Sequence, residues 1–129
     1  IHSLEKLEGF LNKCGLSKEF HNMRTETYSK GMRQKVGIAI ALAKEARVYI
    51  LDEPASGLDP LASNELSALL RKLATSGAGI LMASHDIFRI RETCNRIGII
   101  KNGELLKEMD TSDVSTNELE NIYIEYMQN

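Results

Sequence analysis

Two adjacent acids, Asp52 and Glu53, come directly after the apolar run "RVYIL" in this chain of 129 residues. Two like charges in contact are costly unless a cation or a reaction requires them. Mg²⁺ takes oxygen ligands and often only one or two carboxylates, with phosphate oxygens completing its shell. Because side chains alternate along a strand, we expect the two acids to point in different directions, so that one holds a metal while the other addresses a water.

His85 supplies a third candidate group, because it follows a second apolar run, "GILMAS". Ligands of open α/β sheets bind beyond the carboxyl ends of the strands, and neighbouring strands lie about 4.8 Å apart. If the two runs are neighbouring strands, His85 converges with Asp52 and Glu53 on one ligand. Phosphoryl transfer to water needs a cation, a group that orients the water and a donor to the γ-phosphate. Each residue alone is more often an ordinary surface group, so the hypothesis rests on the combination.

Periodicity and turn residues predict the elements that position these groups. Helices are expected from Leu4 to near Gly15, from the N-cap Ser29 to about Ala46, from Asp59-Pro60 to Gly77, over Asp86–Asn95, and after the capping-box pattern Ser115–Glu118. Strands are expected in "RVYILD" and "GILMAS", with residues 60–76 as a crossover, and in a hairpin around Asn102-Gly103. This order predicts an α/β fold whose sheet has a parallel part and an antiparallel flank.

Composition is that of an ordinary globular domain. Hydrophobic residues make up 43% of the chain, charged residues 26%, and the net charge is −2. This balance indicates one domain and no surface for nucleic acid or membrane. The longest apolar run, residues 36–43, is far short of the ~20 residues of a membrane span. Cys14 and Cys94 have no metal-ligand or CxxC spacing and are expected to be free thiols in a reducing compartment.

Four motifs, taken in order, resemble the ATPase domain of ABC transporters. The stretch "YSKGM" (residues 28–32, the signature segment) resembles the signature motif LSGGQ, and "VYILDE" (48–53) resembles the Walker B motif. The stretch "SGLD" (56–59) resembles the D-loop, and "SHD" around His85 resembles the segment of the switch histidine. The resemblance covers nearly the whole chain. It implies a single partial domain, with residues 1–46 as part of a helical subdomain and 47–129 as the C-terminal part of the catalytic core. The implied fold is a partial P-loop NTPase-like sheet with flanking helices, a helical subdomain remnant at the N-terminus and a C-terminal β-hairpin plus helix.

The resemblance also implies roles for particular residues. Asp52 would hold Mg²⁺, Glu53 would polarise the attacking water and His85 would contact the γ-phosphate. The residues expected to meet ATP bound by a second copy, or to lie at the interface with it, are Ser29, Lys30, Gly31, Met32 and Asp59. Lys30 replaces the first motif glycine, and its charge favours a phosphate. Met32 replaces the glutamine and cannot donate the hydrogen bonds of an amide.

The phosphate-binding motif GxxxxGK[ST], Walker A, is missing from the sequence. None of the nine glycines precedes a lysine, and Gly98 and Gly103 share only the separation of the motif. We therefore expect this chain to be the C-terminal part of the domain. We also expect it to bind ATP and Mg²⁺ weakly or not at all by itself, to bare an apolar sheet face or edge, and to self-associate.

The favoured function is that of an ABC transporter ATP-binding protein, which couples ATP hydrolysis to transport. Its partners would be transmembrane permease subunits and a second ATPase copy, and its location the cytoplasmic face of the cell membrane. One alternative is a related ATPase acting on DNA or ribosomes. The net charge and the lack of a basic stripe disfavour nucleic acid, and "ASGLDP" differs from the asparagine-histidine D-loop of the ribosomal branch. A non-enzymatic binding module is the other alternative, which the retained Glu53 disfavours.

Overall fold

The structure of the chain is a computed structural model that describes residues 2–129. Two compact units can be distinguished by their internal contacts: the N-terminal unit, Ile1–Ala83, and the C-terminal unit, Ser84–Asn129. The division of one partial domain between residues 46 and 47 stays a prediction.

The helices of the N-terminal unit begin where the sequence places N-caps. They are α1 (Leu4–Lys13), α2 (Lys30–Ala43) and α3 (Pro60–Thr75), with short 3₁₀ turns at Lys18–Phe20 and Thr25–Thr27. The side chains of Ser3, Ser29 and Asp59 each accept a hydrogen bond from a backbone N–H of the first turn. The helix α2 ends at Ala43, three residues before the expected end. Glu45 then has φ 58°, and a left-handed residue at this position terminates a helix.

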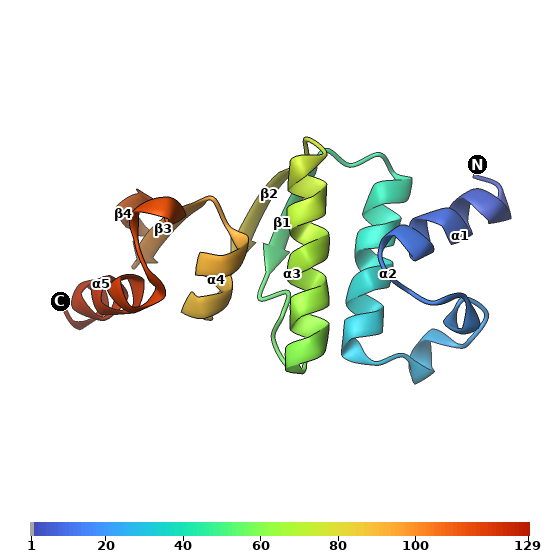
Figure 1. The fold of residues 1–129 in the computed structure, drawn as a ribbon, viewed down its shortest axis with the longest axis horizontal. Coiled ribbons are helices and arrows are strands. Elements are labelled where there is room, and N and C mark those ends of the chain that lie inside the picture. Colours follow the sequence, from blue (N-terminus) through green and yellow to red (C-terminus); the bar gives the residue numbers. More distant parts are fainter. Residues whose placement is uncertain (1) are drawn as a thin grey trace. The chain divides into compact units, whose positions relative to one another are not determined.

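The strands of the N-terminal unit form a parallel pair. β1 (Val48–Asp52) pairs with β2 (Gly79–Ala83) in a register that runs from Val48 opposite Gly79 to Asp52 opposite Ala83. The helix α3 is the crossover between them, as the sequence predicts. It lies between the strand pair and α2, while α1 packs on α2 (Figure 1). The buried core of this unit comprises Cys14, Ile38, Ala39, Tyr49, Leu66, Leu69, Leu70 and Leu73.

The other face of this strand pair is apolar and exposed. Val48, Ile50 and Leu81 are 65%, 78% and 66% exposed. Alternation places Tyr49 and Leu51 on the covered face and these three residues on the opposite one. The expected bare apolar face is therefore present in the structure, and self-association through it stays a prediction.

Local signals shape the C-terminal unit. Its elements are α4 (Ile87–Thr93), β3 (Arg96–Lys101), β4 (Glu104–Asp110), a 3₁₀ turn (Thr111–Asp113) and α5 (Thr116–Gln128). Asn102 and Gly103 have φ 53° and 81°, as a type I′ hairpin requires. The register shifts between Ile99 and Ile100, where β4 carries an extra residue. The Ser115–Glu118 capping box is present, and its hydrogen bonds to Ser115 lower the pKa of Glu118.

The expectation of one sheet with an antiparallel flank is wrong for residues 2–129. The strands form two separate two-stranded sheets, β1–β2 and β3–β4. A hairpin closed by a two-residue turn completes its own hydrogen-bond ladder, so the sequence signal for a hairpin does not specify which sheet it joins. None of the helices in this range has the length and hydropathy that a membrane span requires.

The two cysteines are free thiols, as expected. Burial raises the pKa of the Cys14 thiol from 9.0 to about 11, although the nearby Lys35 lowers it in part. Burial also raises the pKa of Cys94. A thiol with a raised pKa is a poor nucleophile near neutral pH, so both cysteines are suited to structural roles.

Candidate functional site

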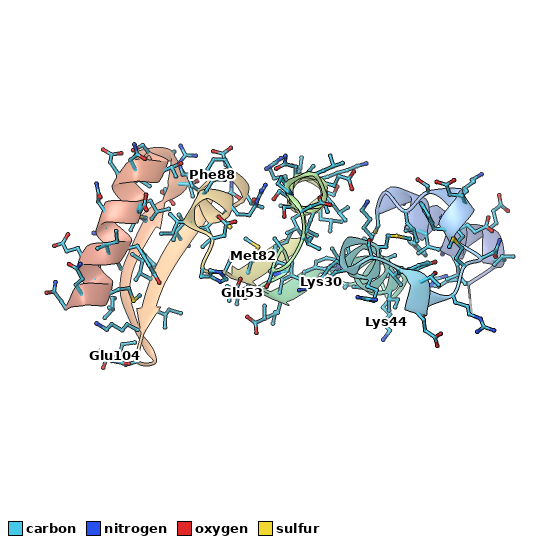
Figure 2. All side chains as sticks on the ribbon, turned by 90° about the horizontal axis from the view of Figure 1, so that it is seen from below. Lys30, Lys44, Glu53, Met82, Phe88 and Glu104 are labelled. Carbon is cyan, nitrogen blue, oxygen red and sulfur yellow. The ribbon has the colours of Figure 1, made fainter. Side chains whose placement is uncertain are left out.

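The acid pair lies at the carboxyl end of β1. Asp52 is the last residue of the strand and is exposed, opposite Ala83 of β2. Glu53 is half-buried and leaves the strand with φ 46° (Figure 2). Its N–H donates to the Ala83 carbonyl at 2.8 Å, and its carbonyl accepts from the Ser56 N–H at 3.1 Å. The strand register and these two bonds hold the backbone groups of Glu53 itself.

The left-handed backbone of Glu53 is the unusual feature of this strand end. A positive φ is uncommon for residues other than glycine, asparagine and aspartate, because Cβ crowds the following carbonyl. Residues held in such conformations cluster at functional sites, where the surrounding structure determines them. The geometry of Glu53 therefore marks this position independently of its charge.

The signature segment lies at the start of α2. Ser29 is the N-cap, and its Oγ accepts a hydrogen bond from the Met32 N–H at 3.2 Å. Lys30, Gly31 and Met32 form the first turn of the 14-residue helix. The first turn of a helix carries backbone N–H groups and a partial positive charge, which together favour an anion. Ser29 and the three following residues thus occupy the positions that the sequence assigned to them.

The start of α2 contacts the linking loop, residues 54–58, which joins the acid pair to α3. A Cβ on Gly57 would lie 3.1 Å from Lys30 Nζ, and a Cβ on Gly31 would lie 3.7 Å from Leu58 Cδ2. The Lys30 ammonium therefore lies against the loop backbone, and Gly31 lies beside Leu58 and closer still to Ala62 of α3, which a Cβ would approach to 3.3 Å. Figure 2 shows the side chains of Lys30 and Glu53. This contact between the signature segment and the linking loop was not predicted from the sequence.

Gln34 is a further contact that the sequence analysis missed. Its Nε2 donates to the Pro54 carbonyl at 2.9 Å. Gln34 lies one helical turn after Lys30, so both residues are on the face of α2 that meets the linking loop. The i, i+4 spacing of Lys30 and Gln34 places two polar side chains on one face of α2, which is the signal that could have indicated this contact.

Asp59 caps the helix that follows the linking loop. Its Oδ1 accepts a hydrogen bond from the Ala62 N–H at 2.7 Å, and the residue is exposed. Pro60 occupies the first helical position, as the sequence predicts. The carboxylate thus has a structural role in this chain, and its place at an interface with a second copy stays a prediction.

His85 belongs to the C-terminal unit. It lies in the short connection between β2 and α4 and is exposed. Because β1 and β2 are neighbouring parallel strands, the topology on which the three-residue hypothesis depends is confirmed. The convergence of His85 with Asp52 and Glu53 on one ligand stays a prediction.

The acid pair fits a cation that takes few protein ligands. In residues 2–129 no group of three or more His, Cys, Asp or Glu side chains is placed to hold a metal ion. A closed protein site such as those of zinc or calcium is therefore not formed by this part of the chain. The exposed Asp52 carboxylate is the kind of oxygen ligand that Mg²⁺ uses when phosphate oxygens supply the rest of its shell.

Comparison with known sequences identifies relatives along most of the chain. The family model described as ABC transporter matches residues 2–56. The ABC transporter ATP-binding protein YhcH of Bacillus subtilis (strain 168) is 33% identical over 125 residues, which are 96% of this chain and 41% of YhcH. The bacitracin transport ATP-binding protein BcrA of Enterococcus faecalis is 35% identical over 123 residues, covering 88% of this chain and 40% of BcrA. The chain therefore spans about two fifths of the length of these relatives.

Comparison with solved structures agrees with the sequence relatives. The dimeric ATP-binding cassette MJ0796, in a post-hydrolysis state bound to ADP and Pi, aligns with a TM-score of 0.73 and 29% identity, covering 86% of this chain and 50% of that one. The cbiO1 subunit from Clostridium perfringens, part of the transporter complex cbiONQ, aligns with a TM-score of 0.75 and 29% identity, covering 84% and 43%. The expected fold class, a partial sheet with flanking helices, is confirmed. The chain belongs to the ABC transporter ATP-binding family and corresponds to part of its ATPase domain.

Proposed function

We propose that the protein hydrolyses Mg-ATP to drive transport across a membrane, and that this chain supplies the acid pair and signature segment of the ATPase site. The observation that carries the proposal is the end of β1, where Glu53 is held at a positive φ directly after an exposed carboxylate. The relative BcrA, a bacitracin transport ATP-binding protein, supports a role in transport. The ADP and Pi bound by MJ0796 support ATP as the nucleotide of the proposed site.

In this proposal the residues at the end of β1 perform distinct tasks. Mg²⁺ supplies the positive charge that offsets the charge developing on the transferred phosphate. Asp52 holds that cation, directly or through water. Glu53 accepts a hydrogen bond from the attacking water and orients it. His85 donates to the γ-phosphate from the connection after β2.

The signature segment serves a nucleotide held by a second copy of the domain. The Ser29 hydroxyl and the first-turn N–H groups of Lys30 and Gly31 face the phosphates of that copy, Met32 completes the same turn, and Asp59 lies at the interface between the two copies. The dimeric state of MJ0796 supports this arrangement. Lys30 departs from the family pattern, and its ammonium lies beside Gly57 of the linking loop. Its charge adds to the positive end of α2.

Transmembrane permease subunits and a position at the cytoplasmic face of the membrane complete the proposal. ATPases that act on DNA or ribosomes remain the alternative, together with a binding module without activity. The relative BcrA is a bacitracin transport protein and cbiO1 is part of the transporter complex cbiONQ, and both favour a function in transport over the alternatives. The net charge of −2 disfavours nucleic acid.

The proposal is tested by Glu53→Gln in the protein that carries the complete ATP-binding domain. We expect kcat for ATP hydrolysis to fall by about 10²–10⁴-fold, because an amide is a poor acceptor for the water proton. ATP binding, measured by isothermal titration, is expected to persist.

Glu45→Gln is the matched control. Glu45 is also a glutamate with a positive φ, 58°, but it is exposed after α2. Its substitution is expected to leave kcat unchanged. Turnover that survives in the Glu53 variant would remove Glu53 from its assigned role, whereas absence of turnover in the parent protein would favour the binding module.

A further inference from the structure

The linking loop contacts the first part of α2 at three of its residues. Gln34 Nε2 donates to the Pro54 carbonyl, Lys30 lies against Gly57, and Gly31 adjoins Leu58. Gln34 is half-buried and Pro54 is buried, so this hydrogen bond is largely shielded from water. A shielded hydrogen bond constrains geometry more than an exposed one, since a buried carbonyl without a partner is unfavourable.

The Pro54 carbonyl is the group through which α2 reaches Glu53. The Glu53 N–H is bound to Ala83 and the Glu53 carbonyl to the Ser56 N–H. These bonds fix the peptide before Glu53 and the turn that follows it. The next carbonyl, that of Pro54, is held by the Gln34 amide at 2.9 Å. A glutamate at φ 46° persists only where its surroundings determine its backbone, and the Gln34 side chain reaches the residue after Glu53 from α2.

We propose that Gln34 is a positioning residue for Glu53. Its side-chain amide fixes the Pro54 peptide, and thereby the left-handed turn that aims the Glu53 carboxylate. Gln34 does not touch the reacting atoms in this scheme and acts through the backbone of the next residue. The inference rests on the proposed function, since it assigns a role in ATP hydrolysis.

The test compares side chains that keep or lose the hydrogen-bond donor. Gln34→Met retains the approximate size of glutamine without a donor, while Gln34→Lys retains a donor of different shape. In the protein with its complete ATP-binding domain, we expect the methionine variant to lose ~10- to 100-fold in kcat with KM for ATP unchanged. The lysine variant is expected to stay within about threefold of the parent protein.

A packing role for Gln34 predicts the reverse order, because methionine fills the same space and lysine does not. Lys35→Met is the matched control on the neighbouring residue of α2. It removes hydrogen bonds to Gly15 and Glu65, away from the linking loop, and is expected to leave kcat unchanged. If thermal unfolding shows that Gln34→Met does not fold, Gln34→Glu replaces it. That variant has an acceptor against the Pro54 carbonyl and is expected to lose the same activity.

Glu53→Gln in the same assay separates the two possible failures. If it abolishes turnover while Gln34→Met leaves kcat unchanged, the positioning role is overturned and the proposed function stands. If turnover survives in Glu53→Gln, the assigned role of Glu53 and its positioning by Gln34 are both overturned, while ATP hydrolysis itself stands. Loss of kcat in the methionine variant, with activity kept in the lysine variant, supports the positioning role.

Discussion

Glu53 and Asn102 each lead the chain out of a strand through the left-handed region of φ, one in each unit. Their φ angles are close, 46° and 53°. Asparagine tolerates this region because its short polar side chain bonds locally, whereas glutamate gains no such compensation. The turn at Asn102 is therefore specified by its own residues, while the turn at Glu53 depends on the structure around it.

The contacts of the two turns differ in sequence separation. Asn102 and Gly103 join Lys101 to Glu104, which pair directly across β3 and β4. The turn at Glu53 is tied to Ala83, thirty residues later, and its next residue to Gln34, twenty residues earlier. In this chain the turn made of local signals completes the hairpin, whereas the turn held by distant residues lies at the candidate site.

The largest expected effect comes from the two cores that support these turns. Leu70 and Leu119 are each 2% exposed, in the N-terminal and C-terminal units respectively. Replacing either by alanine is expected to cost about 2–5 kcal/mol of unfolding free energy, because a buried leucine leaves a cavity. In hydrogen exchange, Leu70→Ala should release the Glu53 amide and leave β3 and β4 protected, and Leu119→Ala should do the opposite.

Equal loss of protection in both units from either leucine variant would break the comparison. It would show that the units unfold together, so that the hairpin also depends on distant residues. Chemical denaturation followed by two probes, one in each unit, provides an independent measurement of the same coupling.

A smaller effect is expected at two glycines that both have positive φ. Gly57 in the linking loop has φ 72°, and Gly103 in the hairpin has φ 81°. Alanine at either position is expected to cost ~1–2 kcal/mol through backbone strain. At Gly57 the new Cβ also meets Lys30 Nζ at 3.1 Å, whereas at Gly103 it meets nothing within 4 Å.

Denaturant midpoints distinguish strain from contact at these glycines. If Gly57→Ala lowers the unfolding free energy more than Gly103→Ala does, adding Lys30→Ala to Gly57→Ala should restore the difference. The lysine ammonium then no longer opposes the new methyl group. If the two glycine variants cost the same with Lys30 present, the ammonium moves aside freely and does not hold the loop.

The sequence predicted those parts of the fold whose signals are local. The caps at Ser29 and Asp59, the Asn102-Gly103 hairpin and the Ser115–Glu118 capping box are all confirmed, because each involves residues within four positions of one another. The parallel pairing of β1 and β2 was predicted from a crossover of sufficient length. Local signals do not specify which sheet a hairpin joins, and the two separate sheets were missed for that reason.

The candidate site was predicted in its residues more than in its geometry. The sequence placed Asp52 and Glu53 at a strand end and Ser29 at a helix start, where the structure has them. It did not predict the φ of Glu53, the contact of Lys30 with Gly57, or the Gln34 hydrogen bond. The last two features depend on side chains that meet only after α2 packs beside the linking loop, and periodicity carries no information on such contacts. The φ of Glu53 accompanies backbone hydrogen bonds to Ala83 and Ser56, of which the first is a contact that periodicity does not reveal either.

The smallest expected effect, and the most direct test of the comparison, uses glycine and alanine at Glu53 and Asn102. Glycine removes the strain of a positive φ, and alanine keeps Cβ without a polar group. At 102 we expect glycine to match the parent asparagine and alanine to cost ~1 kcal/mol. At 53 we expect glycine to raise the unfolding free energy by ~0.5–1 kcal/mol relative to alanine, because it removes the strain of the positive φ. Urea denaturation of the four variants measures these differences. A glycine at 53 that destabilises the chain would mean that the glutamate side chain itself stabilises the turn. Both turns would then be stabilised by their own residues.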